Sequence, residues 1–120
     1  MDNKNIIANL KFNDSQMKEI QLGLDDGLDV SVYDDPKFDC MQMKEIRLGL
    51  KDDLDVSKYA DRKFDCKQMH EIRLGLKDRI DISQCIDLEY DWKKMKEIRR
   101  RLSESREELL NKIELNAIMF

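Results

Sequence analysis

The sequence repeats with a period of 26 residues, almost four times, and no insertion or deletion interrupts the period. Three apolar positions show this most clearly: Phe12, Phe38, Phe64 and Tyr90; Met17, Met43, Met69 and Met95; and Ile20, Ile46, Ile72 and Ile98. Because the spacing is constant, loop lengths are fixed together with the positions of the core residues. A strict period of this length is typical of architectures in which each unit buries its apolar face against its neighbours. The sequence therefore predicts a stacked-repeat protein.

Each unit is predicted to form a long helix followed by a short one. In the second unit Asp39 can cap the backbone amides of the first turn, and Gln42 can reach back to it as in a capping box. Met43 and Ile46 then follow at helical spacing and begin an apolar stripe on one side of the helix. Residues 55–60 are too few for an independent helix and are expected to make one to two turns. The long helices are predicted near residues 14–26, 39–52, 65–78 and 91–114.

The two ends of the array differ from its middle. In the fourth unit Arg101 replaces the glycine of the other three units, so we expect no further unit to stack on the fourth. Residues 5–10 have the phase of the short helix and are expected to form an N-terminal cap. We therefore predict one all-α domain over 1–120, a short α-solenoid of about four 26-residue helix–short-helix repeats with a longer C-terminal capping helix. Its parts are a cap at 1–11, repeats at 12–37, 38–63 and 64–89, and a degenerate fourth repeat with the capping helix at 90–120.

The C-terminal segment carries more apolar surface than one repeat obviously covers. Neither glycine nor proline occurs between Trp92 and Glu114, so the last helix is expected to continue unbroken. Its apolar residues are Leu102, Leu109, Leu110, Ile113 and Phe120. Two interpretations are open: the apolar tail docks back on the last repeat as a cap, or it forms a surface through which two copies make a homodimer.

The composition favours a helix-rich cytoplasmic protein. Charged residues make up 40% of the chain and hydrophobic residues 41%, with one proline and four glycines, a balance typical of thin helical elements with much surface. The net charge of −4 argues against direct nucleic-acid binding, which calls for a basic excess. No apolar run approaches the length of a membrane span, and the first residues lack the layout of a signal peptide. We therefore expect a cytoplasmic location and no membrane partner.

The three cysteines, Cys40, Cys66 and Cys85, are expected to be reduced thiols. Equivalent positions of neighbouring helices lie ~8–10 Å apart, which exceeds the ~7 Å that a disulfide can span. With one histidine and no Cys-x-x-Cys pair, no metal site is expected, and no cofactor either. Cys40 and Cys66 fall in the first turn of their helices, where the helix dipole can favour a thiolate, so redox sensing is the alternative.

Stacking would turn each polar repeat position into a ladder of side chains. The candidate partner-binding ladders are Lys18, Lys44, His70 and Lys96; Arg47, Arg73 and Arg99; and Asp26, Asp52 and Asp78. A solvated charge pattern is the simpler interpretation, in which ladders of opposite sign form exposed ion pairs worth ~0–1 kcal/mol each. No nucleophile–base pair, phosphate loop or metal cluster accompanies the ladders, so we predict no catalytic residue and no enzyme.

Part of the repeat resembles a known tandem repeat. The segments QMKEIRLGL at 42–50 and LDVSKYAD at 54–61 are similar to a repeat of bacterial mobile-element proteins associated with anti-restriction and conjugation. The resemblance covers residues 12 to about 102, and the fourth unit departs from it by reading MKEIRRRL at 95–102. It implies a phage or mobile-element setting and carries no active-site residues with it.

Two functions are therefore expected from the sequence. The first is a non-enzymatic module that binds a protein partner through a repeated surface. The alternative is an inhibitor of a host defence nuclease, of the anti-restriction or anti-CRISPR type, that presents acidic ladders in place of DNA phosphates.

Overall fold

The computed structural model describes residues 11–119, and within them every regular element is helical. The elements are α2 (Asp14–Asp25), η1 (Val30–Val32), α3 (Cys40–Lys51), η2 (Val56–Lys58), α4 (Cys66–Lys77), η3 (Ile82–Gln84) and α5 (Trp92–Met119). The all-α prediction is confirmed for this part of the chain, and the long helices begin within one residue of their predicted starts. The N-terminal cap predicted at residues 5–10 lies outside the described residues.

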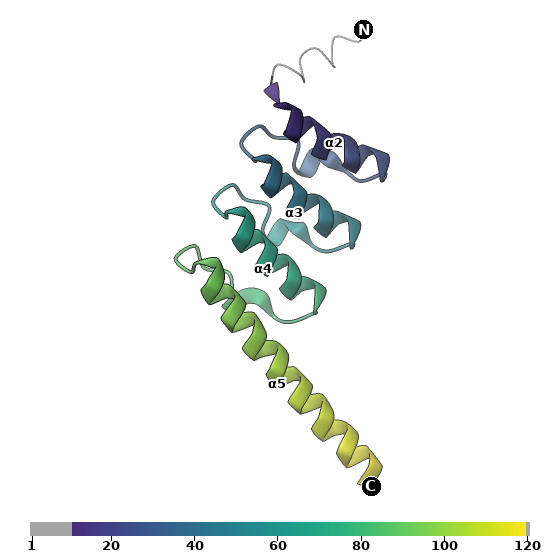
Figure 1. Cartoon of the computed structure of the whole chain (residues 1–120). Helices are drawn as coiled ribbons and strands as arrows, with labels where there is room; N and C mark the ends of the chain where they lie inside the picture. The colour runs from purple at the N-terminus through teal and green to yellow at the C-terminus, as the bar shows by residue number, and fades with distance from the viewer. Residues whose placement is uncertain (1–10, 120) are drawn as a thin grey trace.

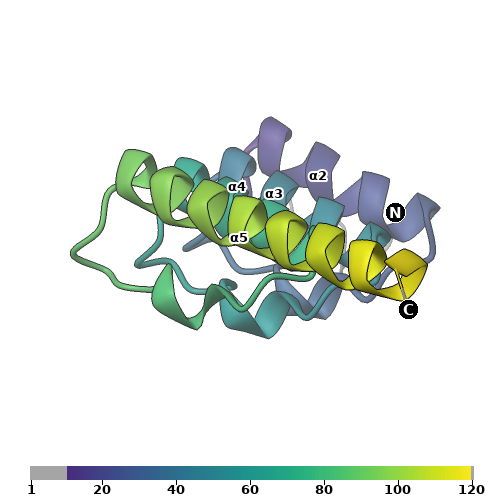
Figure 2. The same cartoon turned by 90° about the horizontal axis from the view of Figure 1, so that it is seen from below.

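The helices pack in chain order, each against the next: α2 on α3, α3 on α4, and α4 on α5. The turns η1 to η3 pack against α2, α3 and α4 respectively, and form a second row beside the helices (Figure 2). The molecule is consequently elongated, with extents of 69 × 31 × 17 Å.

The helix starts follow from the capping boxes. The Asp39 carboxylate accepts a hydrogen bond from the Gln42 backbone N–H at 2.8 Å, and the Gln42 side-chain oxygen accepts one from the Asp39 N–H at 2.9 Å. The same reciprocal pair occurs in α2 and in α4. In α5 the fourth unit has Lys94 in place of glutamine, and Asp91 accepts only the Lys94 backbone N–H.

A buried tyrosine explains the glycine of the first two units, whereas Gly75 of the third unit faces Ile82. The Tyr59 hydroxyl donates to the Glu45 backbone carbonyl at 2.7 Å, and a Cβ atom on Gly49 would lie 2.0 Å from that hydroxyl oxygen. Tyr33 makes the same contact over α2, and burial raises its pKa to about 12. No short turn follows α5 within the described residues, so its side chain at the glycine position, Arg101, meets no such tyrosine.

Two expectations need correction. The short helices are single 3₁₀ turns of three residues each, shorter than the one to two turns predicted. The last helix continues to Met119, and only its first half lies against α4 (Figure 1). In its second half Leu109, Leu110, Ile113, Leu115 and Ile118 are exposed. The interpretation in which this tail docks back on the last repeat is therefore wrong. The Arg106 side chain donates to the Asp78 backbone carbonyl, which helps to fix the direction in which α5 leaves the stack.

Candidate binding surfaces

The arginine ladder joins neighbouring units. Arg47 Nε lies 2.7 Å from the Glu19 carboxylate, and Arg73 Nε lies 2.7 Å from that of Glu45. Arg99 repeats the contact with Glu71 at 3.0 Å. These side chains are largely shielded from water, although the sequence suggested exposed pairs. The arginines are thus engaged within the molecule and are not a free binding surface.

A glutamine ladder, which sequence reasoning read only as helix capping, makes a second link between units. Besides closing its capping box, the Gln42 side-chain amide donates to the Phe64 carbonyl of the next unit at 2.7 Å. Gln16 and Gln68 donate in the same way to Phe38 and Tyr90, each at 2.7 Å. The sequence contains a signal for this contact, because the first three units all have glutamine at this position. Glutamate would also close the capping box, but it could not donate the hydrogen bond to the next unit.

The arginine–glutamate ladder stops at the two ends of the array. Gln21 stands where the following units have arginine, and it donates to Asp25 within its own helix. Glu97 stands where earlier units pair with an arginine of the next unit, and it pairs instead with Lys94 and Arg101 of α5. At each end, the polar side chain at the ladder position therefore bonds within its own helix.

The acidic ladder is also partly paired. Asp26 lies 3.6 Å from Lys51, Asp52 lies 3.4 Å from Lys77, and Asp78 lies 3.9 Å from Arg99. These aspartates are exposed at the C-terminal ends of α2, α3 and α4. Lysines and an arginine of the next unit thus interrupt the acidic edge.

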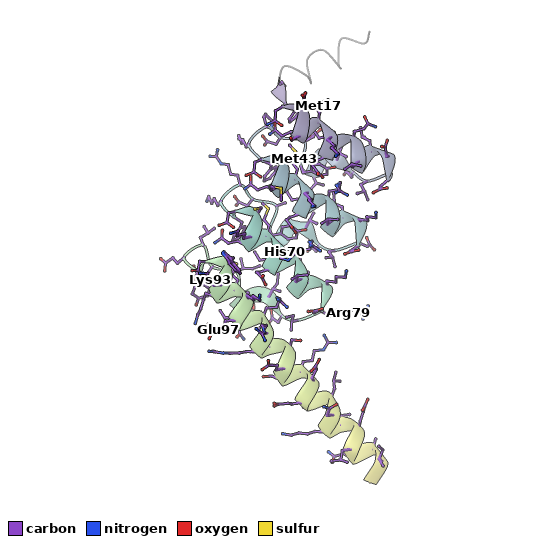
Figure 3. All side chains as sticks on the ribbon, in the orientation of Figure 1. Met17, Met43, His70, Arg79, Lys93 and Glu97 are labelled. Carbon is purple, nitrogen blue, oxygen red and sulfur yellow. The ribbon has the colours of Figure 1, made fainter. Side chains whose placement is uncertain are left out.

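The remaining ladder contains the exposed Lys18, Lys44 and Lys96 and the half-buried His70. His70 Nδ1 lies 3.2 Å from the Glu45 carboxylate and 3.2 Å from a guanidinium nitrogen of Arg73. His70 therefore joins the ion pair beneath it, whereas the lysines face solvent. Figure 3 shows His70 on α4 within the row of helices.

An open groove of 460 Å³ crosses the N-terminal halves of α3, α4 and α5 beside this ladder. Its lining residues are Met41, Glu45, Cys66, Lys67, His70, Glu71, Trp92 and Lys96. Met41 is 49% exposed, and the Lys67 ammonium lies 5.5 Å from the centre of the Trp92 ring. Glu45 and Glu71, the two carboxylates of the lining, already pair with the largely shielded Arg73 and Arg99, so they are less available to Lys67 and Lys96. The groove lining therefore combines the apolar side chains of Met41 and Trp92 with the exposed cations of Lys67 and Lys96.

The three cysteines are at most partly exposed to solvent. All three are free thiols, and Cys85 is buried. Burial, followed by the nearby carboxylates of Asp39 and Asp65, raises the pKa of the Cys66 thiol. This direction is opposite to the one expected from the helix dipole, because burial disfavours the charged thiolate.

Comparisons with known proteins identify no relative: no protein-family model, no curated protein and no solved structure matches the chain. Among residues 11–119, no group of histidine, cysteine or acidic side chains could hold a metal ion. In the same part of the chain, no helix combines the length and the apolar character needed to cross a membrane.

Proposed function

We propose that the chain is a short α-solenoid of four 26-residue units that binds a protein partner in the groove across α3, α4 and α5. We further propose that the bound segment is acidic and carries an apolar anchor residue. The repeated cross-unit contacts of glutamine, glutamate and arginine support the solenoid. The groove, with Trp92 in its lining, is the observation that supports the binding site.

The chemistry of the groove argues for a peptide segment. Tryptophan and methionine are enriched at protein interfaces, and a tryptophan often supplies a large share of the binding free energy. Lys67 and Lys96 line the groove together with Met41 and Trp92, so acidic side chains of a partner would find complementary charge there. A groove that spans three helices also suits an extended segment, because successive partner residues can contact successive units.

The test is a selection of random peptides, displayed on phage, for binding to the full chain. We expect the selected peptides to share acidic residues around one apolar residue. Trp92→Ala should weaken their binding by about 30-fold, the equivalent of about 2 kcal/mol at an interface hot spot. Leu88→Ala is the matched control, because Leu88 is exposed in the loop before α5 and lies outside the groove.

Circular dichroism of Trp92→Ala separates loss of the site from loss of the fold. Lys67→Glu provides a second probe, since it reverses a charge at an exposed position. It should weaken binding of the acidic peptides, and the loss should be larger at low salt than at high salt. Selected peptides without an acidic bias, or peptides that bind Trp92→Ala as tightly as the parent, would contradict the proposed site.

The setting in a phage or mobile element, and the alternative of a nuclease inhibitor, are supported by the sequence resemblance. The exposed aspartates at the ends of α2 to α4 favour a DNA mimic, but Lys51, Lys77 and Arg99 interrupt that edge. We therefore place this function second. A partner whose binding depends on the acidic edge and not on Trp92 would reverse that order.

A further inference from the structure

The C-terminal helix carries an apolar stripe that continues beyond the stack. Ile98, Leu102, Leu109 and Ile113 are spaced by four, seven and four residues, so they lie on one side of α5. Ile98 and Leu102 are half-buried, whereas Leu109 is 58% exposed and Ile113 is 55% exposed. The stripe therefore begins against the last repeat and ends in solvent.

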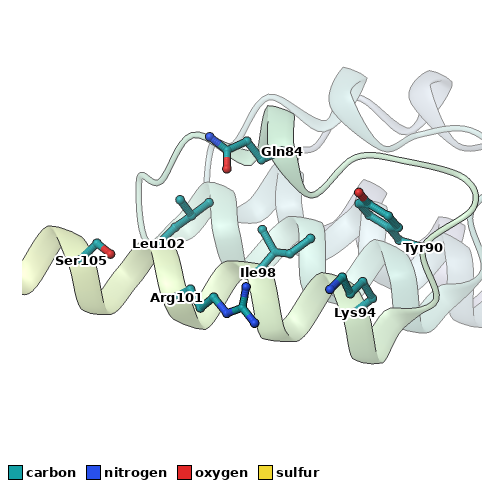
Figure 4. A pocket seen from close by; sticks show the side chains of 7 residues that line it. All are labelled: Gln84, Tyr90, Lys94, Ile98, Arg101, Leu102 and Ser105. Atoms are coloured by element: carbon teal, nitrogen blue, oxygen red, sulfur yellow. The ribbon is translucent and has the colours of Figure 1, made fainter.

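A hollow of 560 Å³ lies at the start of this stripe (Figure 4). Gln84, Tyr90, Lys94, Ile98, Arg101, Leu102 and Ser105 line it. In the second unit the corresponding side of α3 is covered, because Val56 and Tyr59 of the following turn pack over Gly49. α5 continues as a helix instead of turning back, so nothing in the described part of the chain covers Ile98 and Leu102 in this way.

The charges along α5 are unevenly distributed. Its first part exposes the basic residues Lys93, Lys94, Lys96, Arg100 and Arg101 and one acidic residue, Glu97. Its second part exposes the acidic residues Glu104, Glu107, Glu108 and Glu114 and two basic residues, Arg106 and Lys112, so the first part is net basic and the second net acidic. Two such helices side by side in the same direction would place like charges together, whereas opposite directions place the basic part of each beside the acidic part of the other.

We propose that the occupant of the hollow is a second copy of this chain, whose α5 pairs antiparallel with the first about a two-fold axis near Ser105. This register sets Leu102 opposite the partner's Leu109, and Ile98 opposite the partner's Ile113. The small Ser105 side chain at the centre allows the two helices to approach closely. The two-fold axis makes every contact occur twice, as in most homodimers.

The same register matches charges beside the stripe. Arg101 and Glu108 lie on the same side of α5, one turn from the axis in opposite directions along the helix. Across the two-fold axis, Arg101 therefore faces the partner's Glu108. This interface uses a different part of α5 from the Trp92 groove. The proposed dimer can therefore be tested independently of the proposed peptide site.

The first measurement is the mass in solution by light scattering of the full chain. We expect twice the monomer mass of 14.3 kDa at micromolar concentrations. Leu109→Asp should give the monomer mass with an unchanged circular dichroism spectrum, because Leu109 is exposed in the single chain. A parent that stays monomeric across micromolar concentrations would overturn the proposal.

Two charge-reversed variants test the register. Arg101→Glu and Glu108→Arg should each be largely monomeric, because each places like charges together twice across the axis. An equimolar mixture of the two should dimerise again, since an Arg101→Glu copy then meets opposite charges on a Glu108→Arg copy at both sites. If the parent dimerises but the mixture stays monomeric, or if the single variants dimerise as well as the parent, the antiparallel register is wrong.

Discussion

Replacing Glu45 by alanine is expected to lower the free energy of unfolding by about 3–5 kcal/mol, the range for removing one partner of a buried ion pair. Arg73 is 8% exposed and would lose the carboxylate that lies 2.7 Å from its Nε atom. His70 would lose a contact to the same carboxylate. A loss of this size is a large part of the stability of a small domain. Urea unfolding followed by circular dichroism measures it.

Glu97→Ala is the matched control. Glu97 has the same phase in the repeat, but it is exposed and pairs only with residues of its own helix. Its removal should change the free energy of unfolding by no more than about 0.5 kcal/mol. Equal effects at the two positions would mean that the contact between units does not stabilise the fold.

Ile46→Ala is expected to cost about 2–5 kcal/mol, because the substitution empties a packed aliphatic site. Ile46 is fully buried and belongs to the core cluster, together with Met43 and Tyr59. The side chains around Ile46 come from the long helices and from the row of 3₁₀ turns. Because hydrogen bonds hold these elements in place, their side chains can fill only part of the cavity that the substitution leaves. The midpoint of urea unfolding should fall accordingly.

The control for this substitution is Ile118→Ala, the same change at a position that is 83% exposed. It should leave the midpoint almost unchanged. An Ile46→Ala protein that unfolds at the same urea concentration as the parent would contradict the assignment of Ile46 to the core.

The helices could be predicted from the sequence because their signals are local. The Asp39–Gln42 capping box and the spacing of Met43 and Ile46 each depend on residues within a few turns, and the period repeated these signals along the chain. The close approach of Tyr59 to Gly49 could not be predicted from the sequence, because it depends on how the turn folds back on the preceding helix.

The candidate sites depended on contacts that local signals do not contain. The burial of Arg73 follows from the distance between adjacent helices, and the sequence alone gave it an exposed position. Trp92 and Met41 line the same groove because the N-terminal halves of α3, α4 and α5 lie side by side. The second half of α5 differs from the predicted cap because the segment stays helical to Met119 and does not fold back on α4 within the described residues.

Small-angle X-ray scattering of Leu109→Asp tests the central claim that the units stack in one direction. The substitution keeps the proposed dimer from contributing to the measurement. Stacking predicts a radius of gyration near the 18.2 Å of the Cα atoms and a longest dimension near 69 Å. A compact globular domain of this length would have a radius of gyration of about 14 Å. A measured value close to that compact figure would contradict the stacked arrangement.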